Sequence, residues 1–290
     1  MNPTIAKLIS AGPVITDGAW GTQLQLRGLP PGSIPDVWNL TNPGAVEEVG
    51  KAYVDAGSQV ILTNTLLANR FILGRHGLGD KVADVNRIGV EISKRAAQDK
   101  AKVFASIGPS GLMLLMGDVS EDELLAAFAQ QAQAQAKAGA DGIVVETMSD
   151  LAEAKLAVAA ALETGLPVVA CMSFDSGTNR DRTMMGVAPE QAAEKLSEAG
   201  ADVIGANCGQ GIAGYAPICS RLHDSTDKPI WIKANAGMPR ATDGKAVYAQ
   251  TPEEFASFAP KLILAGATFI GGCCGTTPEF IRALVEIAKK

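Results

Sequence analysis

The stretch Ala138-Gly139-Ala140-Asp141-Gly142-Ile143 decides the fold, because its pattern recurs along the chain. An Ala-Gly pair followed closely by an apolar run returns at 56–61, 199–204 and 265–270. Glycine in this place ends a helix in the left-handed conformation, and the apolar run predicts a buried strand. The copies lie roughly 60–80 residues apart, which is the length of about two strand–helix units.

Strand-like and helix-like stretches alternate over the whole chain. Eight short apolar runs predict strands at 14–16, 60–65, 103–107, 142–147, 168–174, 203–207, 230–234 and 268–272. The main stretches predicted as helices between them are 44–56, 121–138, 150–163, 189–199, 252–265 and 278–289. Eight such units without a break in composition predict a single (βα)8 TIM barrel over residues 1–290. An open doubly wound sheet is the alternative, but Asp17-Gly18-Ala19-Trp20-Gly21-Thr22 after the first strand is not its glycine fingerprint.

Composition excludes several classes of protein. With 290 residues and 47% hydrophobic content, the chain can bury a large core, which argues against disorder. A net charge of −6 without a basic block argues against nucleic-acid binding. No apolar run approaches the roughly 18 residues of a membrane span, and the N-terminal residues do not resemble a secretion signal. We therefore expect a cytoplasmic protein with no membrane or nucleic-acid partner.

Two connecting segments carry further expectations. The segment Gly28–Pro43 contains four prolines and is expected as an ordered loop over the barrel mouth. The segment Gln130–Ala138 is rich in Gln and Ala. Because both residues are good helix formers, we interpret it as the solvated face of a helix.

Three of the five cysteines fall at predicted strand ends, where barrel enzymes carry their chemistry. Cys208 ends the sixth strand, and Cys273 and Cys274 follow the eighth within a glycine-rich turn. Three thiolates from these places can hold a zinc ion and leave its fourth position open. Three small buried hydrophobic residues are the alternative interpretation, since free cysteine is often buried. Cys171 and Cys219 are expected in the core.

Asp17 and Glu146 are carboxylates at the ends of the first and fourth predicted strands. They can cap helices or pair with a loop arginine, but two carboxylates facing an open metal position would also bind an α-ammonium group. Lys233 in the seventh strand is an alternative covalent residue, as a Schiff-base lysine. The two histidines, His76 and His223, are expected at the surface or at helix ends.

Several motifs together resemble the homocysteine S-methyltransferase family over essentially the whole chain. They are Asp17–Thr22 (DGAWGT), Leu62–Thr65 (LTNT), Val145–Thr147 (VET), Ala206–Cys208 (ANC) and Gly271–Pro278 (GGCCGTTP). The resemblance implies a (βα)8 barrel with one zinc ion held by Cys208, Cys273 and Cys274. It implies that Asp17 and Glu146 hold the amino group of homocysteine, and that Thr63, Asn64, Thr65 and Asn235 help to line the pocket.

The resemblance also implies a reaction. A free thiol with a pKa of about 8.5 is mostly protonated at neutral pH, and zinc as a Lewis acid would present the homocysteine sulfur as a thiolate. The sulfur would attack an activated methyl group, and methionine, a neutral thioether, would leave. This donor step needs no general acid, which agrees with a chain that has two histidines.

The methyl donor is the open part of this expectation. Family members use a methylated corrinoid, betaine, or S-methylmethionine and related sulfonium compounds. Trp20 and Trp38 are the donor-side candidates, since a quaternary ammonium would need aromatic faces. Leu66-Leu67 stands where animal betaine enzymes have aromatic residues. We therefore expect methylcobalamin delivered by a separate corrinoid protein, with betaine or a sulfonium donor as the alternative.

Two hypotheses of other classes remain at this point. The first is a metal-free TIM-barrel lyase or isomerase that uses Lys233 covalently and binds phosphate at the glycine-rich strand ends. The second is a non-enzymatic thiol sensor based on Cys273 and Cys274. A bound metal would distinguish methyl transfer from the metal-free lyase or isomerase. Binding of homocysteine would distinguish methyl transfer from the thiol sensor.

Overall fold

Eight parallel strands form a barrel in the computed structural model, which describes residues 1–242 and 245–288. They are β1 (Val14–Ile15), β2 (Val60–Leu62), β3 (Lys102–Ile107), β4 (Gly142–Met148), β5 (Val168–Met172), β6 (Val203–Gly211), β7 (Ile230–Asn235) and β10 (Ala267–Gly272). Their order is β1-β10-β7-β6-β5-β4-β3-β2. A parallel bridge between Thr16 and Val60 closes the ring between β1 and β2. The predicted (βα)8 barrel is confirmed, and the open sheet is excluded.

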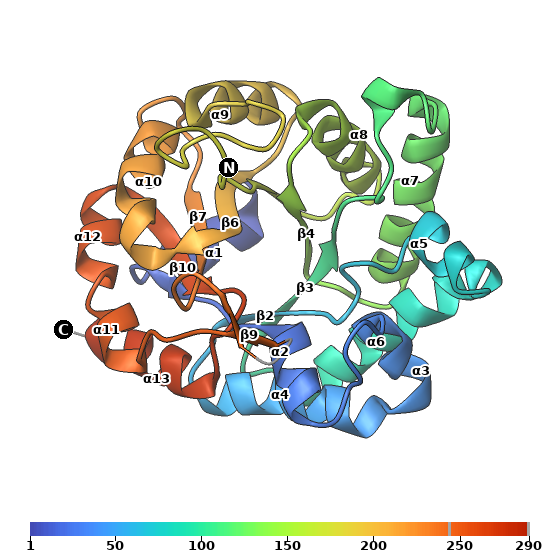
Figure 1. Ribbon diagram of the computed structural model, residues 1–290, viewed down its shortest axis with the longest axis horizontal. Coiled ribbons are helices and arrows are strands. Elements are labelled where there is room, and N and C mark those ends of the chain that lie inside the picture. Colours follow the sequence, from blue (N-terminus) through green and yellow to red (C-terminus); the bar gives the residue numbers. More distant parts are fainter. Residues whose placement is uncertain (243–244, 289–290) are drawn as a thin grey trace.

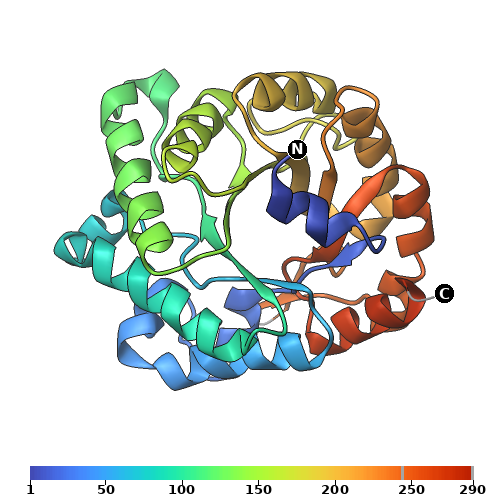
Figure 2. The ribbon, with the colours of Figure 1, turned by 180° about the vertical axis from the view of Figure 1, so that it is seen from behind.

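Most of the helices surround the strands as an outer layer, while α1 (Pro3–Ile9) and α3 (Trp38–Thr41) lie at the two ends of the barrel (Figure 1 and Figure 2). The other helices are α2 (Trp20–Leu26), α4 (Pro43–Asp55), α5 (Arg70–Arg75), α6 (Val82–Ala97), α7 (Glu121–Lys137), α8 (Leu151–Leu162), α9 (Pro189–Glu198), α10 (Tyr215–His223), α11 (Pro252–Ala256), α12 (Ala259–Leu264) and α13 (Pro278–Ala288). A short antiparallel hairpin, β8 (Arg240–Thr242) and β9 (Lys245–Val247), follows β7. In the part of the chain that the structure describes, no helix is long and apolar enough to cross a membrane.

The repeated Ala-Gly junctions end helices as the sequence predicts. Gly57, Gly139, Gly200 and Gly266 all have positive φ, between 91° and 101°. A side chain bearing a Cβ is disfavoured in this conformation, so glycine ends each helix and directs the chain into the next strand. This local signal therefore sets the alternation of helices and strands.

The bottom of the barrel is filled by large side chains. Trp231 of β7 stacks on Phe269 and Phe104, with ring centroids 5.0 and 6.3 Å apart. Ile5 of α1 packs against the same cluster, and Figure 2 shows α1 lying across this end of the barrel. Because the bottom is closed and apolar, polar chemistry is confined to the opposite, C-terminal end of the strands.

Two expectations about helices are wrong. The stretch 252–265 forms two helices, α11 and α12, rather than one. Pro260 in the first turn of α12 has no N–H to continue the helix from Ala256. The segment Gln130–Ala138 is not wholly solvated, because Gln131 and Gln135 are fully buried. Their amides donate to backbone carbonyls, that of Gln131 to Thr65 O at 2.7 Å in the turn after β2 and that of Gln135 to Ser106 O at 3.0 Å in β3.

The loop after β1 covers part of the mouth, as expected. It carries the short 3-10 helix Pro35–Val37 and then α3, and Pro35 and Asp36 line the cavity at the mouth. The predicted strand 60–65 is shorter than expected, because β2 ends at Leu62. Thr63, Asn64 and Thr65 therefore lie in the turn beyond the strand.

Candidate metal centre and acceptor pocket

Three cysteine sulfurs converge at the C-terminal end of the barrel. Cys208 comes from β6, and Cys273 and Cys274 follow β10, two strands away in the ring. Their Sγ atoms all lie within 4.8 Å of one another, and those of Cys208 and Cys274 are 3.9 Å apart. The structure thus brings together the three residues that the sequence singled out.

The backbone around the sulfurs is held in place by specific contacts. Cys208 has a φ of 60°, the left-handed conformation, and its carbonyl accepts a hydrogen bond from Tyr215 Oη at 2.6 Å. The N–H of Cys273 donates to Ala234 O at 2.7 Å. A residue other than glycine in the left-handed region is costly unless its surroundings impose it, so this strain is stored at the cluster.

The geometry of the cluster fits a zinc ion. Sulfurs bound about 2.3 Å from a tetrahedral zinc lie roughly 3.8 Å apart, close to the separation of Cys208 and Cys274. Cys208, Cys273 and Cys274 are partly exposed, whereas Cys171 and Cys219 are buried in the core, as expected for those two. The interpretation of the three as buried hydrophobic residues is therefore not favoured. Soft thiolate ligands in this number are typical of zinc sites.

The three thiols also share protons. Hydrogen bonds from Cys273 and Cys274 lower the pKa of Cys208 to about 3. The same contacts with Cys208 raise the pKa of Cys274 to about 12 and that of Cys273 well above its usual value. The first negative charge in the cluster is thus stabilised by the neighbouring S–H groups.

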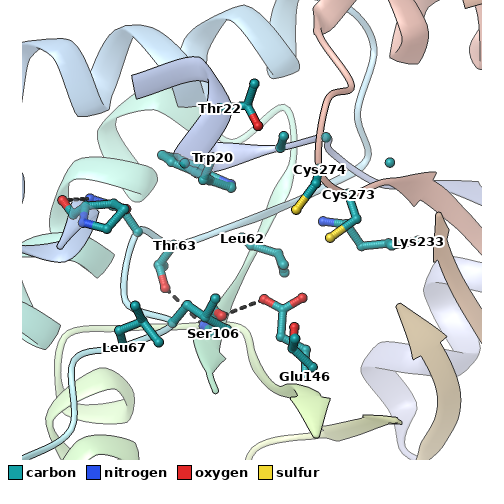
Figure 3. A pocket seen from close by; sticks show the side chains of 18 of the residues that line it. Trp20, Thr22, Leu62, Thr63, Leu67, Ser106, Glu146, Lys233, Cys273 and Cys274 are labelled. Carbon is teal, nitrogen blue, oxygen red and sulfur yellow. Dashed lines mark hydrogen bonds between the residues drawn. The ribbon is translucent and has the colours of Figure 1, made fainter. Parts of the chain in front are cut away.

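A cavity of about 180 Å³ adjoins the sulfurs at the barrel mouth. Cys273 and Cys274 border it beside Lys233 and Glu146, as Figure 3 shows. Its wall includes Trp20, Leu62, Thr63, Asn64, Leu66, Leu67 and Ser106. The cavity therefore combines two sulfurs, one buried cation and the carboxyl groups of Glu146 and Asp36 with an apolar wall.

Glu146 is a buried carboxyl group at the end of β4. Burial raises its pKa above the usual value, although Lys233 and Ser106 oppose this. Ser106 Oγ donates to Glu146 Oε1 at 2.6 Å, and Asn207 Nδ2 lies 3.3 Å from Oε2. A cationic group that enters the cavity would favour the ionised form of Glu146.

Asp17 is fully buried and does not line the cavity. One of its carboxylate oxygens pairs with Lys233 Nζ, and the other accepts from Trp20 Nε1 and the N–H of Leu62, both at 2.7 Å. Direct contact of Asp17 with a substrate ammonium therefore stays a prediction, and Glu146 is better placed for it.

Lys233 is held as an ammonium ion. Burial by itself lowers the pKa of Lys233, but Asp17 and Glu146 outweigh burial and leave the pKa above its ordinary value. A Schiff-base lysine must be a neutral amine. This geometry therefore does not favour the covalent role that the sequence left open for Lys233.

The other candidates occupy different places. Thr63, Asn64 and Trp20 line the cavity. Asn235 is buried beside Cys208, whose pKa its side chain helps to lower. Trp38 is half-buried against the helical layer and is not among the residues that line the cavity. His76 and His223 are exposed at helix ends, as expected.

Sequence reasoning missed several residues around the site. Ser106 and Asp36 line the cavity, and Tyr248 contacts Cys274. Ser106 is the penultimate residue of β3 and lies within an apolar run. A polar residue in that place was the signal that could have found it. The position of Asp36 at the cavity depends on how the loop after β1 folds back, where the carboxyl group of Asp36 accepts from the N–H of Leu67. No local sequence pattern indicates this contact.

Comparison with known proteins gives consistent matches. The family model described as homocysteine S-methyltransferase matches residues 14–288. Methionine synthases of Mycobacterium leprae and Mycobacterium tuberculosis are each 31% identical to this chain, over 96% and 95% of it. The chain spans about a quarter (24%) of the length of these curated relatives.

Solved structures agree with the sequence comparison. The metallated form of the homocysteine methyltransferase MmuM from Escherichia coli superimposes with a TM-score of 0.80 at 25% identity, covering 98% of this chain and 99% of that one. Its oxidised form also has a TM-score of 0.80, at 24% identity, with 99% of each chain covered. With the family model matching nearly the whole barrel, the chain belongs to the homocysteine S-methyltransferase family.

Proposed function

We propose that residues 1–290 form one zinc-dependent barrel domain that methylates homocysteine to methionine. The observation that carries this proposal is the convergence of three cysteine sulfurs beside a cavity that also holds a buried carboxyl group. The family membership of the chain supports the acceptor, and the sulfur geometry supports the metal. The five free cysteines agree with a reducing compartment, so we propose a cytoplasmic location.

Cys208, Cys273 and Cys274 would hold the zinc ion as thiolates. Bound zinc supplies a Lewis acid that keeps an acceptor thiol ionised at neutral pH. Glu146 would bind the ammonium group of homocysteine, with Ser106 and Asn207 fixing its orientation. Thr63 and Asn64 would contact the acceptor from the wall, while Asn235 and Asp17 would support the floor from behind.

We propose a methylated corrinoid, brought by a separate protein or domain, as the donor. The cavity wall near the mouth is aliphatic, with Leu62, Leu66 and Leu67, and Trp20 is its one tryptophan among the described residues. An onium donor would need several aromatic faces. Exposed apolar side chains also lie on loops that follow strand ends at the mouth, which suits contact with a large partner; they are Met113, Leu115, Met116, Met184 and Met238.

Betaine or a sulfonium compound such as S-methylmethionine is the second candidate donor. The observation in its favour is Trp20, whose ring borders the cavity beside the sulfurs (Figure 3). Trp38 would have to move to contribute a second aromatic face, because it packs on the helical layer.

A donor panel tests this proposal. Zinc-loaded protein is incubated with homocysteine and methylcobalamin, betaine or S-methylmethionine, and methionine is measured. Methionine from methylcobalamin alone supports the corrinoid route, and methionine from an onium donor alone overturns it. Full activity in metal-free protein would overturn the role of zinc.

A further inference from the structure

Lys233 has hydrogen-bonding capacity that the described structure does not use. Its ammonium carries three N–H donors, and Asp17 is its one hydrogen-bond partner among the described residues. The side chain is 3% exposed, yet it lines the cavity beside Cys273. Buried donors without partners are costly, so the spare N–H groups of Lys233 indicate a ligand that accepts hydrogen bonds.

The charges around the cavity identify the kind of acceptor. Lys233 is the one cationic side chain among the described residues that line it. Glu146 and the cysteine thiolates would repel an anion that entered without meeting Lys233. Two carboxyl groups line the cavity, Asp36 and Glu146, and Lys233 is the cation that can offset their repulsion of an anion.

We propose that Lys233 binds the α-carboxylate of the acceptor amino acid and makes the site specific for thiols that carry one. This inference rests on the proposed function, because it places the ammonium of homocysteine at Glu146 and the thiol at the sulfur cluster. Asp17 holds Lys233 in position from behind, since its carboxylate binds the ammonium away from the cavity. The Asp17–Lys233 pair therefore acts as a fixed carboxylate receptor.

Binding measurements with two acceptors test Lys233 directly. Calorimetry compares homocysteine with its decarboxylated analogue on zinc-loaded wild-type protein and on Lys233→Gln. A charge-assisted hydrogen bond is worth enough to weaken homocysteine binding by about 10–100-fold when it is lost. Binding of the decarboxylated analogue should stay the same. Equal loss for both acceptors, or no loss for either, would overturn the proposal.

A second variant covers the case in which Lys233→Gln is poorly folded. Asp17→Asn/Lys233→Met removes both charges, so neither is left buried without its partner. It should again lose affinity for homocysteine and keep affinity for the analogue. Lys155→Gln, an exposed lysine on α8, is the matched control and should change neither affinity.

Failure of this inference is distinguishable from failure of the proposed function. If wild-type protein binds homocysteine but no donor yields methionine, the reaction is wrong, and the comparison of acceptors still tests Lys233. If wild-type protein binds the decarboxylated analogue as tightly as homocysteine, Lys233 does not bind the carboxylate, whatever the result of the donor panel.

Discussion

Asn207 of β6 binds both Glu146 and Thr147 of β4 across the intervening strand β5. Its Nδ2 donates to Thr147 Oγ1 at 2.8 Å and to Glu146 Oε2 at 3.3 Å. Its Oδ1 accepts the N–H of Thr147 at 2.7 Å. Thr147 has a φ of 62° and lies where the register of β4 shifts, so this amide holds a strained stretch of strand next to Glu146, which lines the cavity.

Asn207→Ala should therefore misplace Glu146. We expect KM for homocysteine to rise about 10-fold with a smaller change in kcat, and stability to fall by about 1–3 kcal/mol, since buried hydrogen bonds are lost. Steady-state kinetics and urea unfolding measure the two effects. Ser173→Ala is the control, because Ser173 Oγ donates to Asn207 O without touching Glu146. An equal rise in KM for both variants would contradict the positioning role of Asn207.

Metal binding should depend on the three clustered cysteines and on no other cysteine. Wild-type protein should contain about one zinc ion per chain. Cys208→Ser, Cys273→Ser and Cys274→Ser should each lose most of it, because serine is a poor ligand for a soft site. Cys219→Ala, a buried cysteine of α10, should keep its zinc. Elemental analysis after dialysis gives the answer, and full zinc content in Cys208→Ser would refute the assignment.

Asp36 should make the protein less stable as the pH rises. Burial raises the pKa of Asp36 from 3.8 to about 7, partly offset by the hydrogen bond from the N–H of Leu67. Between these values the unfolded chain is ionised while the folded protein keeps the proton, so stability is lost as the pH rises through this window. At ~1.4 kcal/mol per pH unit, the upper limit is about 4 kcal/mol.

Asp36→Asn should remove this pH dependence. Asparagine keeps an oxygen for the N–H of Leu67, which lies 2.7 Å from the carboxyl oxygen, but it does not titrate. The variant should be more stable than wild type above pH about 7. Urea unfolding across the window measures it, with the exposed Asp224→Asn as control. If the stability of the wild type rises with pH in this window in parallel with that of the variant, Asp36 does not keep its proton in the folded protein.

Gly272→Ala should disturb the turn that carries Cys273. A Cβ at this position would lie 2.3 Å from Thr276 Oγ1. That hydroxyl donates to Cys273 O at 2.8 Å and accepts from the N–H of Ala19. We expect a loss of about 1–3 kcal/mol of stability together with reduced zinc content.

The matched control for this variant is Gly44→Ala on α4. A Cβ there meets nothing within 4 Å, and alanine favours a helix over glycine. Thermal unfolding should show a small gain in stability for Gly44→Ala and a loss for Gly272→Ala. A gain for both would mean that Thr276 moves aside freely.

The sequence by itself determined the barrel and its sulfur cluster. Glycine at 57, 139, 200 and 266 sets helix ends through a local backbone preference. The apolar runs set the strands, and the strand ends of a barrel always lie at one mouth. Cys208 and the Cys273-Cys274 pair could therefore be placed together without coordinates.

Only the tertiary structure decided how charges pair inside the barrel. Lys233 and Asp17 are 216 residues apart, and their strands β7 and β1 are separated by β10 in the ring. Inward side chains from alternate strands meet in one layer, so the partner of each charge depends on the register of the closed ring. Consecutive residues encode backbone conformation and periodicity, but this register forms only when the whole barrel closes. For that reason the sequence predicts that Asp17 and Glu146 both bind the substrate ammonium. In the structure Asp17 pairs with Lys233, and Glu146 lines the cavity.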